Sequence, residues 1–184
     1  MTEEHGGIPG HVRERASRVR LAVFDVDGTL TDGRLWFDDA GIESKAYHVH
    51  DGLGMRLLVD VGGVEIALIT ARESASVKAR ARDLRIEHVF TKVPDKLACL
   101  TALCEQLGLS LSEVAYMGDD LADLGVFPHV GLAVAPANVH DWVRESVHWV
   151  TSKGGGDGAA RELCDLILDV RGKRPAVLAR FQSP

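Results

Sequence analysis

The sequence predicts an α/β domain in which a parallel β-sheet is covered by helices on both faces. Short apolar runs alternate along the chain with longer segments of helical pattern, which is the order expected of a parallel sheet. The apolar runs are hydrophobic throughout, as strands buried on both faces should be. The chain has 184 residues, of which 46% are hydrophobic, so one domain of this kind can bury a full core.

Five apolar runs are the expected strands: RLAVFD (20–25), VEIALIT (64–70), EHVFT (87–91), EVAYMGD (113–119) and VGLAV (130–134). Five segments are the expected helices: GLGMRLLVDV (52–61), SASVKARARDL (74–84), DKLACLTALCEQLG (95–108), ANVHDWVRE (137–145) and GAARELCDLILDV (158–170). Residues 33–49 break this alternation, because two extended pieces flank an Asp-Asp-Ala-Gly turn. They predict a β-hairpin that projects from the sheet and is too short to be a cap domain.

These elements divide the chain into three parts. Residues 1–19 are expected to form a flexible arm, and residues 20–170 the α/β domain with its hairpin near 33–49. Residues 171–184 are expected to form a C-terminal tail, and the glycine run at 154–158 a flexible loop.

Composition excludes several classes of partner. A formal charge of −6 argues against broad attraction to nucleic acid or to an anionic membrane. No apolar run approaches the length of a transmembrane helix, and the N-terminus lacks the apolar region of a secretory signal. The three cysteines have no paired or metal-site spacing, which favours reduced thiols and a cytoplasmic protein.

Polar side chains follow three of the expected strands at the point where each strand ends. Asp25 and Asp27 follow the first strand, Thr70 the second, and Asp119 and Asp120 the fourth. In open α/β sheets, ligands bind beyond the carboxyl ends of the strands. We therefore expect these residues to meet in one crevice.

This set of residues suits phosphate ester chemistry. Clustered carboxylates repel one another, and Mg²⁺, which prefers oxygen ligands, relieves the repulsion. A carboxylate such as Asp25 can form an aspartyl-phosphate, and a second one such as Asp27 can transfer protons. The Thr70 hydroxyl and the Lys96 ammonium can bind the phosphoryl group. Each residue alone has an ordinary capping or surface role, so the prediction depends on the set.

Four segments carrying these residues resemble the motifs of the haloacid dehalogenase superfamily: DVDGTLTDG (25–33), ALITAR (67–72), DKL (95–97) and GDDLAD (118–123). The resemblance spans roughly residues 20–170 and implies the Rossmann-like fold of that superfamily. It implies that Asp25 is the nucleophile and Asp27 the general acid and base. It also implies that Mg²⁺ is held by Asp25, Asp119 and the backbone carbonyl of Asp27.

The same resemblance assigns the remaining motif residues. Thr70 and Lys96 would bind the phosphoryl group. Asp120 and Asp123 would contact the metal ligands and not the ion itself, and one of them would orient Lys96. Only a hairpin and one helix separate Asp27 from the second motif, so the chain resembles the capless members.

Residues 32–58, 114–123 and 156–168 are similar to the capless phosphatases that act on sugar acid phosphates. This similarity implies hydrolysis of an eight-carbon sugar acid phosphate in lipopolysaccharide synthesis. It also implies a homotetramer with packed hairpins, in which the tail reaches a neighbouring active site. Ten residues would contact the substrate: Asp27, His48, Val49, His50, Asp51, Gly52, Arg56, Arg72, Arg80 and Lys96.

Other functions remain open at this point. His50 stands where arginine is frequent in these phosphatases, so a nine-carbon sugar acid phosphate is an alternative substrate. A phosphomutase or a dehalogenase could use the same scaffold, although the first would need a cap and the second would not need Asp27. Related domains fused to cytidylyltransferases suggest a non-catalytic tetramerisation module as a further alternative.

Overall fold

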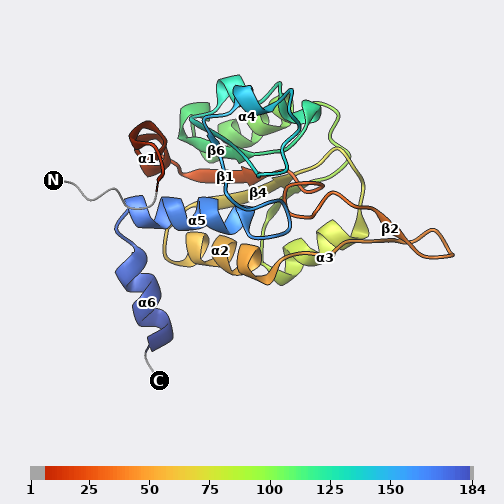
Figure 1. The fold of residues 1–184 in the computed structure, drawn as a ribbon, viewed down its shortest axis with the longest axis horizontal. Coiled ribbons are helices and arrows are strands. Elements are labelled where there is room, and N and C mark those ends of the chain that lie inside the picture. Colours follow the sequence, from red (N-terminus) through yellow and green to blue (C-terminus); the bar gives the residue numbers. More distant parts are fainter. Residues whose placement is uncertain (1–6, 183–184) are drawn as a thin grey trace.

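The computed structural model describes residues 7–182, and its centre is a six-stranded parallel sheet (Figure 1). The strand order is β5-β4-β1-β6-β7-β8. The strands are β1 (Leu21–Phe24), β4 (Glu65–Ile69), β5 (His88–Phe90), β6 (Val114–Met117), β7 (Leu132–Ala135) and β8 (Trp149–Val150). The first five confirm the predicted strands. The edge strand β8 has only two residues, too few to give the periodicity from which a strand is predicted.

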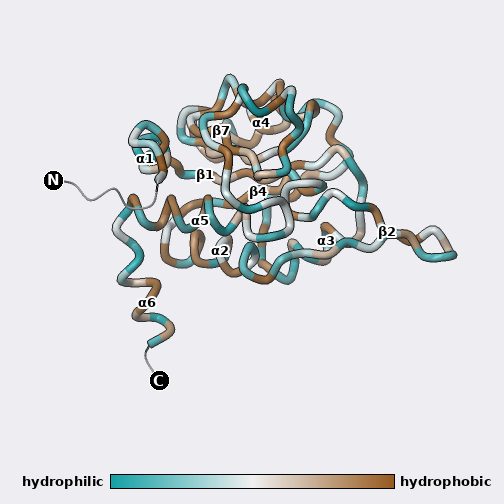
Figure 2. The backbone as a smooth tube through the Cα atoms, viewed as in Figure 1, coloured by the Kyte–Doolittle hydropathy of each residue, from teal (hydrophilic) through white to brown (hydrophobic). Residues whose placement is uncertain are grey.

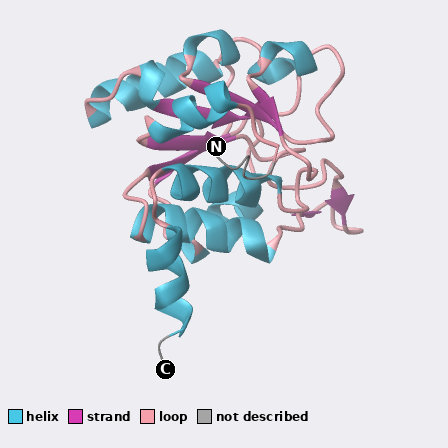
Figure 3. Ribbon diagram, turned by 60° about the vertical axis from the view of Figure 1, so that its left-hand side comes forward, coloured by secondary structure: helices cyan, strands magenta, loops and turns pink. Residues whose placement is uncertain are grey.

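Helices cover both faces of this sheet, which confirms the predicted fold class (Figures 1 and 3). One face carries α1 (Gly10–Ser17), α2 (Val49–Asp60), α3 (Ala75–Asp83) and α5 (Ala159–Val170). The other face carries α4 (Lys96–Leu107). Short 3₁₀ turns complete the loops: η1 (Leu111–Glu113), η2 (Leu121–Asp123), η3 (Phe127–His129) and η4 (Arg144–Ser146).

The strands are apolar on both sides because each side packs against a helical layer. In β1, Ala22 and Phe24 belong to the core cluster under α2 and α5. Leu21 and Val23 belong to the cluster under α4. Successive side chains of a strand point to opposite faces, so the continuous apolar run correctly predicts a central strand.

The expected hairpin is present as an antiparallel pair, β2 (Trp36–Phe37) and β3 (Glu43–Ser44). Its turn is closed by the carboxylate of Asp38, which accepts hydrogen bonds from the backbone N–H groups of Ala40 and Ile42. The hairpin projects from the body (Figure 1) and exposes an apolar stretch around β2 (Figure 2). Trp36 is 59% exposed.

The flexible arm predicted over residues 1–19 is wrong for residues 10–17, which form α1. Val12 and Ala16 are fully buried in the same cluster as α5. Residues four positions apart lie on the same face of a helix, but two apolar residues are too few to give a helical pattern in a polar segment. Residues 1–6 of the predicted arm lie outside the described residues.

Two other local predictions differ from the structure. The helix predicted over 137–145 is replaced by turns that end in η4. There the backbone N–H of His140 donates to the carbonyl of Asp119, 2.9 Å away, instead of to a helical partner. The loop at 154–158, expected to be flexible, packs closely against the loop after β1, because a side chain on Gly155 would lie 1.9 Å from the carbonyl oxygen of Gly28. That close approach requires glycine.

The C-terminal tail contains a helix, α6 (Arg174–Gln182), which extends away from the body (Figure 1). None of its side chains is buried. Among residues 7–182, no helix is both long and apolar enough to cross a membrane.

Candidate active site

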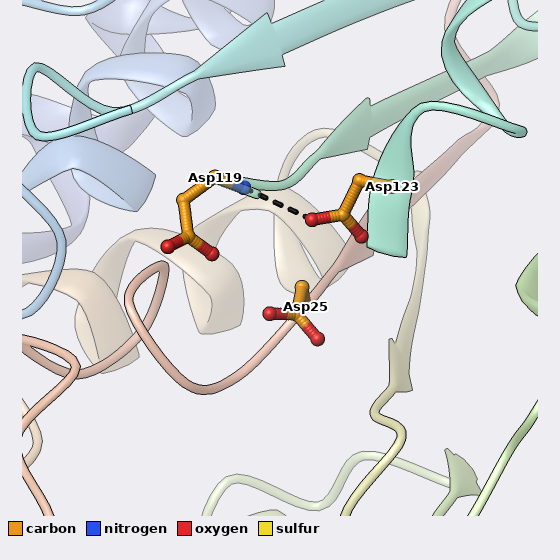
Figure 4. A group of neighbouring side chains, drawn as sticks. All are labelled: Asp25, Asp119 and Asp123. Carbon is orange, nitrogen blue, oxygen red and sulfur yellow. Dashed lines mark hydrogen bonds between the residues drawn. The ribbon is translucent and has the colours of Figure 1, made fainter. Parts of the chain in front are cut away.

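The polar residues that end β1, β4 and β6 meet at the carboxyl edge of the sheet, as predicted. Asp25 follows β1, Thr70 follows β4, and Asp119 follows β6. Carboxylate oxygens of Asp25, Asp119 and Asp123 all lie within 4.8 Å of one another (Figure 4). Residues that are nearly a hundred positions apart in the chain therefore form one acidic cluster.

Lys96 provides the positive charge of this cluster. Its ammonium lies 2.7 Å from Oδ1 of Asp25 and 2.6 Å from Oδ1 of Asp123. Lys96 is the first residue of α4, and the side chain of the preceding Asp95 caps that helix. A lysine at a helix N-terminus is unfavourable for the helix dipole, so the carboxylates, not the helix, account for its position.

Asp123 holds Lys96 in place. Its Oδ1 accepts hydrogen bonds from Lys96 and from the hydroxyl of Tyr116, each 2.6 Å away. Its Oδ2 accepts from the backbone N–H groups of Asp119 and Asp120, at 3.0 and 3.3 Å. All of these partners are donors, so the site requires an ionised carboxylate here. Between Asp120 and Asp123, the structure thus assigns Asp123 as the residue that orients Lys96, while Asp120 caps η2.

Asp119 approaches the first motif at a glycine. A side chain on Gly28 would lie 2.0 Å from Oδ2 of Asp119, and Gly28 has φ +85°. Glycine therefore provides both the space and the backbone conformation. Thr29 donates to Oδ1 of Asp119 at 3.2 Å, which orients the carboxylate.

Burial disfavours the ionised form of the carboxyl groups in this cluster. Burial, and then the charge of Asp123, raise the pKa of Asp25 to about 7 although Lys96 opposes the shift. The same two causes raise the pKa of Asp119 to about 6. The cluster is thus arranged for a bound positive charge that would lower both pKa values.

The hairpin brings a second charged cluster to Asp27, which no local sequence pattern predicts. The buried ammonium of Lys45 forms ion pairs with Asp27 and with Glu43. Arg72, at the end of β4, also pairs with Glu43 and lies 3.8 Å from Oδ2 of Asp27. Asp27 therefore has two cationic side chains beside it. No local sequence signal indicates Lys45, because a lysine in a polar hairpin is normally exposed.

Asn138 is another residue that the sequence did not indicate. Its side-chain amide donates to the carbonyl of Gly28 at 2.9 Å, and its carbonyl accepts from Gly155 N–H at 2.6 Å. It ties the loop after β1 to the glycine loop at 154–158, so this loop supports the active site.

Several of the residues predicted to bind substrate have structural partners within the fold. Thr70 is buried, and its hydroxyl accepts from Arg72 N–H at 3.2 Å. His48 caps α2 by accepting from His50 N–H at 3.2 Å. Buried Asp51 accepts from Arg161 N–H at 2.8 Å, at the N-terminus of α5.

The two helix arginines are likewise engaged. Arg56 donates to the carbonyl of Leu84 and pairs with Asp60 at 2.7 Å. Arg80 pairs with Asp83 at 2.7 Å, and also donates to the carbonyl of His48. Val49 is 72% exposed, and Gly52 is buried. Substrate binding by these side chains remains a prediction.

The chain resembles known hydrolases along most of its length. The family model for haloacid dehalogenase-like hydrolases matches residues 85–163. The 3-deoxy-D-manno-octulosonate 8-phosphate phosphatase KdsC of Salmonella typhi is 40% identical over 169 residues, which cover 92% of this chain and 89% of that relative. The chain belongs to the haloacid dehalogenase-like hydrolases.

Solved structures agree with this assignment. A hypothetical protein from Xanthomonas campestris is 51% identical, with a TM-score of 0.94 and 97% of both chains covered. The 3-deoxy-D-manno-octulosonate 8-phosphate phosphatase of Moraxella catarrhalis, in complex with a magnesium ion, a phosphate ion and a KDO molecule, is 39% identical. Its TM-score is 0.92, with 95% of this chain and 100% of that chain covered.

The acidic cluster fits the divalent cation of a haloacid dehalogenase-like hydrolase. Ionised Asp25, Asp119 and Asp123 with the ammonium of Lys96 leave two negative charges, and the candidate ligands are oxygens. Both features suit Mg²⁺. Because Asp123 already accepts from four donors, we expect Asp25, Asp119 and the carbonyl of Asp27 to hold the ion.

Stabilisation of this hydrolase by Mg²⁺ should increase with pH. With pKa values of about 7 and about 6, Asp25 and Asp119 bind more protons in the folded than in the unfolded chain between pH 4 and pH 7. These two groups therefore lower the stability of the metal-free protein as pH rises through that window. The ion displaces the same protons, so its apparent affinity should rise on the order of 10²–10³-fold from pH 5 to pH 8.

Thermal unfolding with and without MgCl₂ measures this effect. At a fixed salt concentration, the Mg²⁺-induced rise in Tm should be about 5–10 °C larger at pH 8 than at pH 5. Asp119→Asn is the control, since it should remove most of the rise at both pH values. An equal rise at both pH values would contradict the assignment.

Proposed function

We propose that this protein hydrolyses 3-deoxy-D-manno-octulosonate 8-phosphate to the free sugar acid and inorganic phosphate, in lipopolysaccharide biosynthesis. The observation that carries the proposal is the acidic cluster of Asp25, Asp119 and Asp123 around Lys96. The likeness to the phosphatase of Moraxella catarrhalis, in complex with magnesium, phosphate and KDO, supports this substrate.

Hydrolysis proceeds in two steps on Asp25. Its carboxylate attacks phosphorus, the bond from phosphorus to the sugar oxygen breaks, and Asp27 gives a proton to that oxygen. Asp27 then takes a proton from a water molecule, whose oxygen attacks the aspartyl-phosphate. Phosphate leaves, Asp25 is a carboxylate again, and Asp27 is protonated for the next cycle.

The surrounding residues prepare these steps. Lys96 contacts Asp25 directly, so it can pair with a phosphoryl oxygen beside the nucleophile. The hydroxyl of Thr70 is a second donor at the same sheet edge. Bound Mg²⁺ supplies positive charge that keeps Asp25 ionised and offsets the charge of the phosphate.

The sugar acid would lie over the N-terminus of α2 and the end of β4. We propose that its hydroxyls and carboxylate contact six residues there: His48, Val49, His50, Asp51, Gly52 and Arg72. Arginine matches carboxylates well, and Arg72 is the most accessible of the predicted arginines, with 43% of its side chain exposed. Arg56 and Arg80, which also donate to the carbonyls of Leu84 and His48 and so join α2 to α3, stay predicted substrate contacts.

Association of this chain into a homotetramer is the second part of the proposal. The hairpin exposes Trp36 and Phe37 by more than half, and packed hairpins would bury them. The α6 helix leaves the body at the end opposite the hairpin (Figure 1), and we propose that it reaches the active site of a neighbouring subunit. Sedimentation of the purified protein measures the assembly. The cytoplasmic location stays a prediction.

Phosphate release from a panel of esters tests the proposed reaction. With MgCl₂, the eight-carbon sugar acid 8-phosphate should have the highest kcat/KM, and activity should disappear with a chelator. A higher kcat/KM for a nine-carbon sugar acid 9-phosphate would change the assigned substrate. A folded tetramer with no release from any ester would favour the structural module.

A further inference from the structure

We propose that Lys45 is a positioning residue that holds Asp27 by one carboxylate oxygen and leaves the other free for proton transfer. The inference rests on the proposed function, because it concerns the acid and base of that reaction. Lys45 lies directly after β3, so the hairpin contributes this residue to the active site.

The burial of Lys45 indicates a dedicated site. Its side chain is fully buried, and the ammonium forms ion pairs with Asp27 and with Glu43, the latter at 3.0 Å. Burying an ammonium is costly unless it is paired with carboxylates in good geometry. A hairpin that needed only to fold would place a lysine in water, where its charge costs nothing.

The two oxygens of Asp27 differ as a result. Oδ1 accepts the hydrogen bond from Lys45. Oδ2 is buried and has no hydrogen-bond partner among the described residues, and the nearby Arg72 Nε, at 3.8 Å, is beyond hydrogen-bond distance. A buried carboxylate oxygen without a donor is unfavourable, and a substrate or water oxygen would supply the missing partner.

Glu43 fixes Lys45 from the other side. It pairs with Lys45 and with Arg72, so the two carboxylates of Asp27 and Glu43 face two cations. The two cations balance the charges of these two carboxylates without the acidic cluster of Asp25. Lys96 therefore pairs with the nucleophile Asp25, and Lys45 pairs with Asp27, the residue that transfers the proton.

Removing Lys45 should reduce turnover more than substrate binding. Without the ammonium, Asp27 can rotate, and Oδ2 is no longer held at the reacting oxygen. General acid–base catalysis is worth about 10²–10⁴-fold, and a misplaced side chain loses part of it. We expect Lys45→Met to lower kcat about 10–100-fold with KM changed by less than about threefold.

A double-mutant cycle distinguishes positioning from general stability. The four proteins are wild type, Lys45→Met, Asp27→Asn and the double variant, assayed with p-nitrophenyl phosphate and MgCl₂. This ester has a good leaving group, so Asp27→Asn should retain measurable turnover. If Lys45 acts through Asp27, Lys45→Met should cost less than about twofold in the Asp27→Asn background.

Lys78→Met is the matched control, since Lys78 pairs with Glu73 on the exposed surface and its kcat should match wild type. An equal loss from Lys45→Met in both backgrounds, or wild-type kcat in Lys45→Met, would overturn the inference. Should Lys45→Met not fold, Glu43→Gln replaces it in the same cycle, with an expected loss of about 3–10-fold only when Asp27 is present.

The result of this cycle can be distinguished from the result of the substrate test. If the wild type hydrolyses p-nitrophenyl phosphate but not the sugar acid phosphate, the proposed function fails while the cycle still tests Lys45.

Discussion

Asp25→Asn should lower phosphate release by at least about 10³-fold and leave the protein folded. An amide does not attack phosphorus to form the acyl phosphate, so the first step is lost. The remaining residues still bind the ester, and KM should change much less than kcat.

The fold should tolerate this change because an ionised Asp25 carboxylate is unfavourable in its buried surroundings. Asp25 is 6% exposed, and burial raises the pKa of its carboxyl to about 7. A neutral amide removes that cost, while Lys96 keeps its ion pair with Asp123 at 2.6 Å. We therefore expect the metal-free Tm of Asp25→Asn at pH 8 to equal or exceed that of wild type, whereas the rise in Tm on adding MgCl₂ should shrink.

Single-turnover assays and thermal unfolding of the same samples check both parts. Asp32→Asn is the matched control: Asp32 lies in the same loop but is paired with exposed Arg34, and its turnover should equal that of wild type. Retained turnover in Asp25→Asn would remove Asp25 from the role of nucleophile.

The sequence predicts those parts of the site that depend on strand ends. Asp25, Thr70 and Asp119 each follow a continuous apolar run, and parallel strands bring such positions to one edge. Burial on both faces determines the runs, so these predictions need no knowledge of the loops. The hairpin is also predictable, because the turn residues around Asp38 leave a local signal.

Parts that depend on packing between distant segments are not predictable in this way. Lys45 becomes buried only because the hairpin returns over Asp27, and its polar neighbours suggest an exposed residue. Similarly, the composition of the glycine loop suggests flexibility, but the loop packs closely where Gly155 approaches Gly28. Two candidates three positions apart, Asp120 and Asp123, differ in the direction that the 3₁₀ turn η2 gives their side chains.

Because η2 directs the carboxylate of Asp123 towards Lys96, we also expect a large effect from Asp123→Asn. Whichever way the amide is turned, its NH₂ group faces donors. On one side are Lys96 and Tyr116, whose pKa is raised well above its usual value, chiefly by burial, so that its hydroxyl stays protonated. On the other side are the backbone N–H groups of Asp119 and Asp120. Asparagine is therefore not conservative here.

We expect Asp123→Asn to lower the free energy of unfolding by about 2–4 kcal/mol, because it leaves buried donors unpaired beside a buried ammonium. Turnover should fall about 10²-fold or more in the protein that remains folded, since Lys96 loses the carboxylate that directs it towards Asp25. Chemical denaturation and kcat at a temperature below unfolding measure the two effects. Asp120→Asn, one turn away and exposed, should change neither by more than about 0.5 kcal/mol or twofold. Equal effects of the two substitutions would mean that Lys96 does not depend on Asp123 for its position.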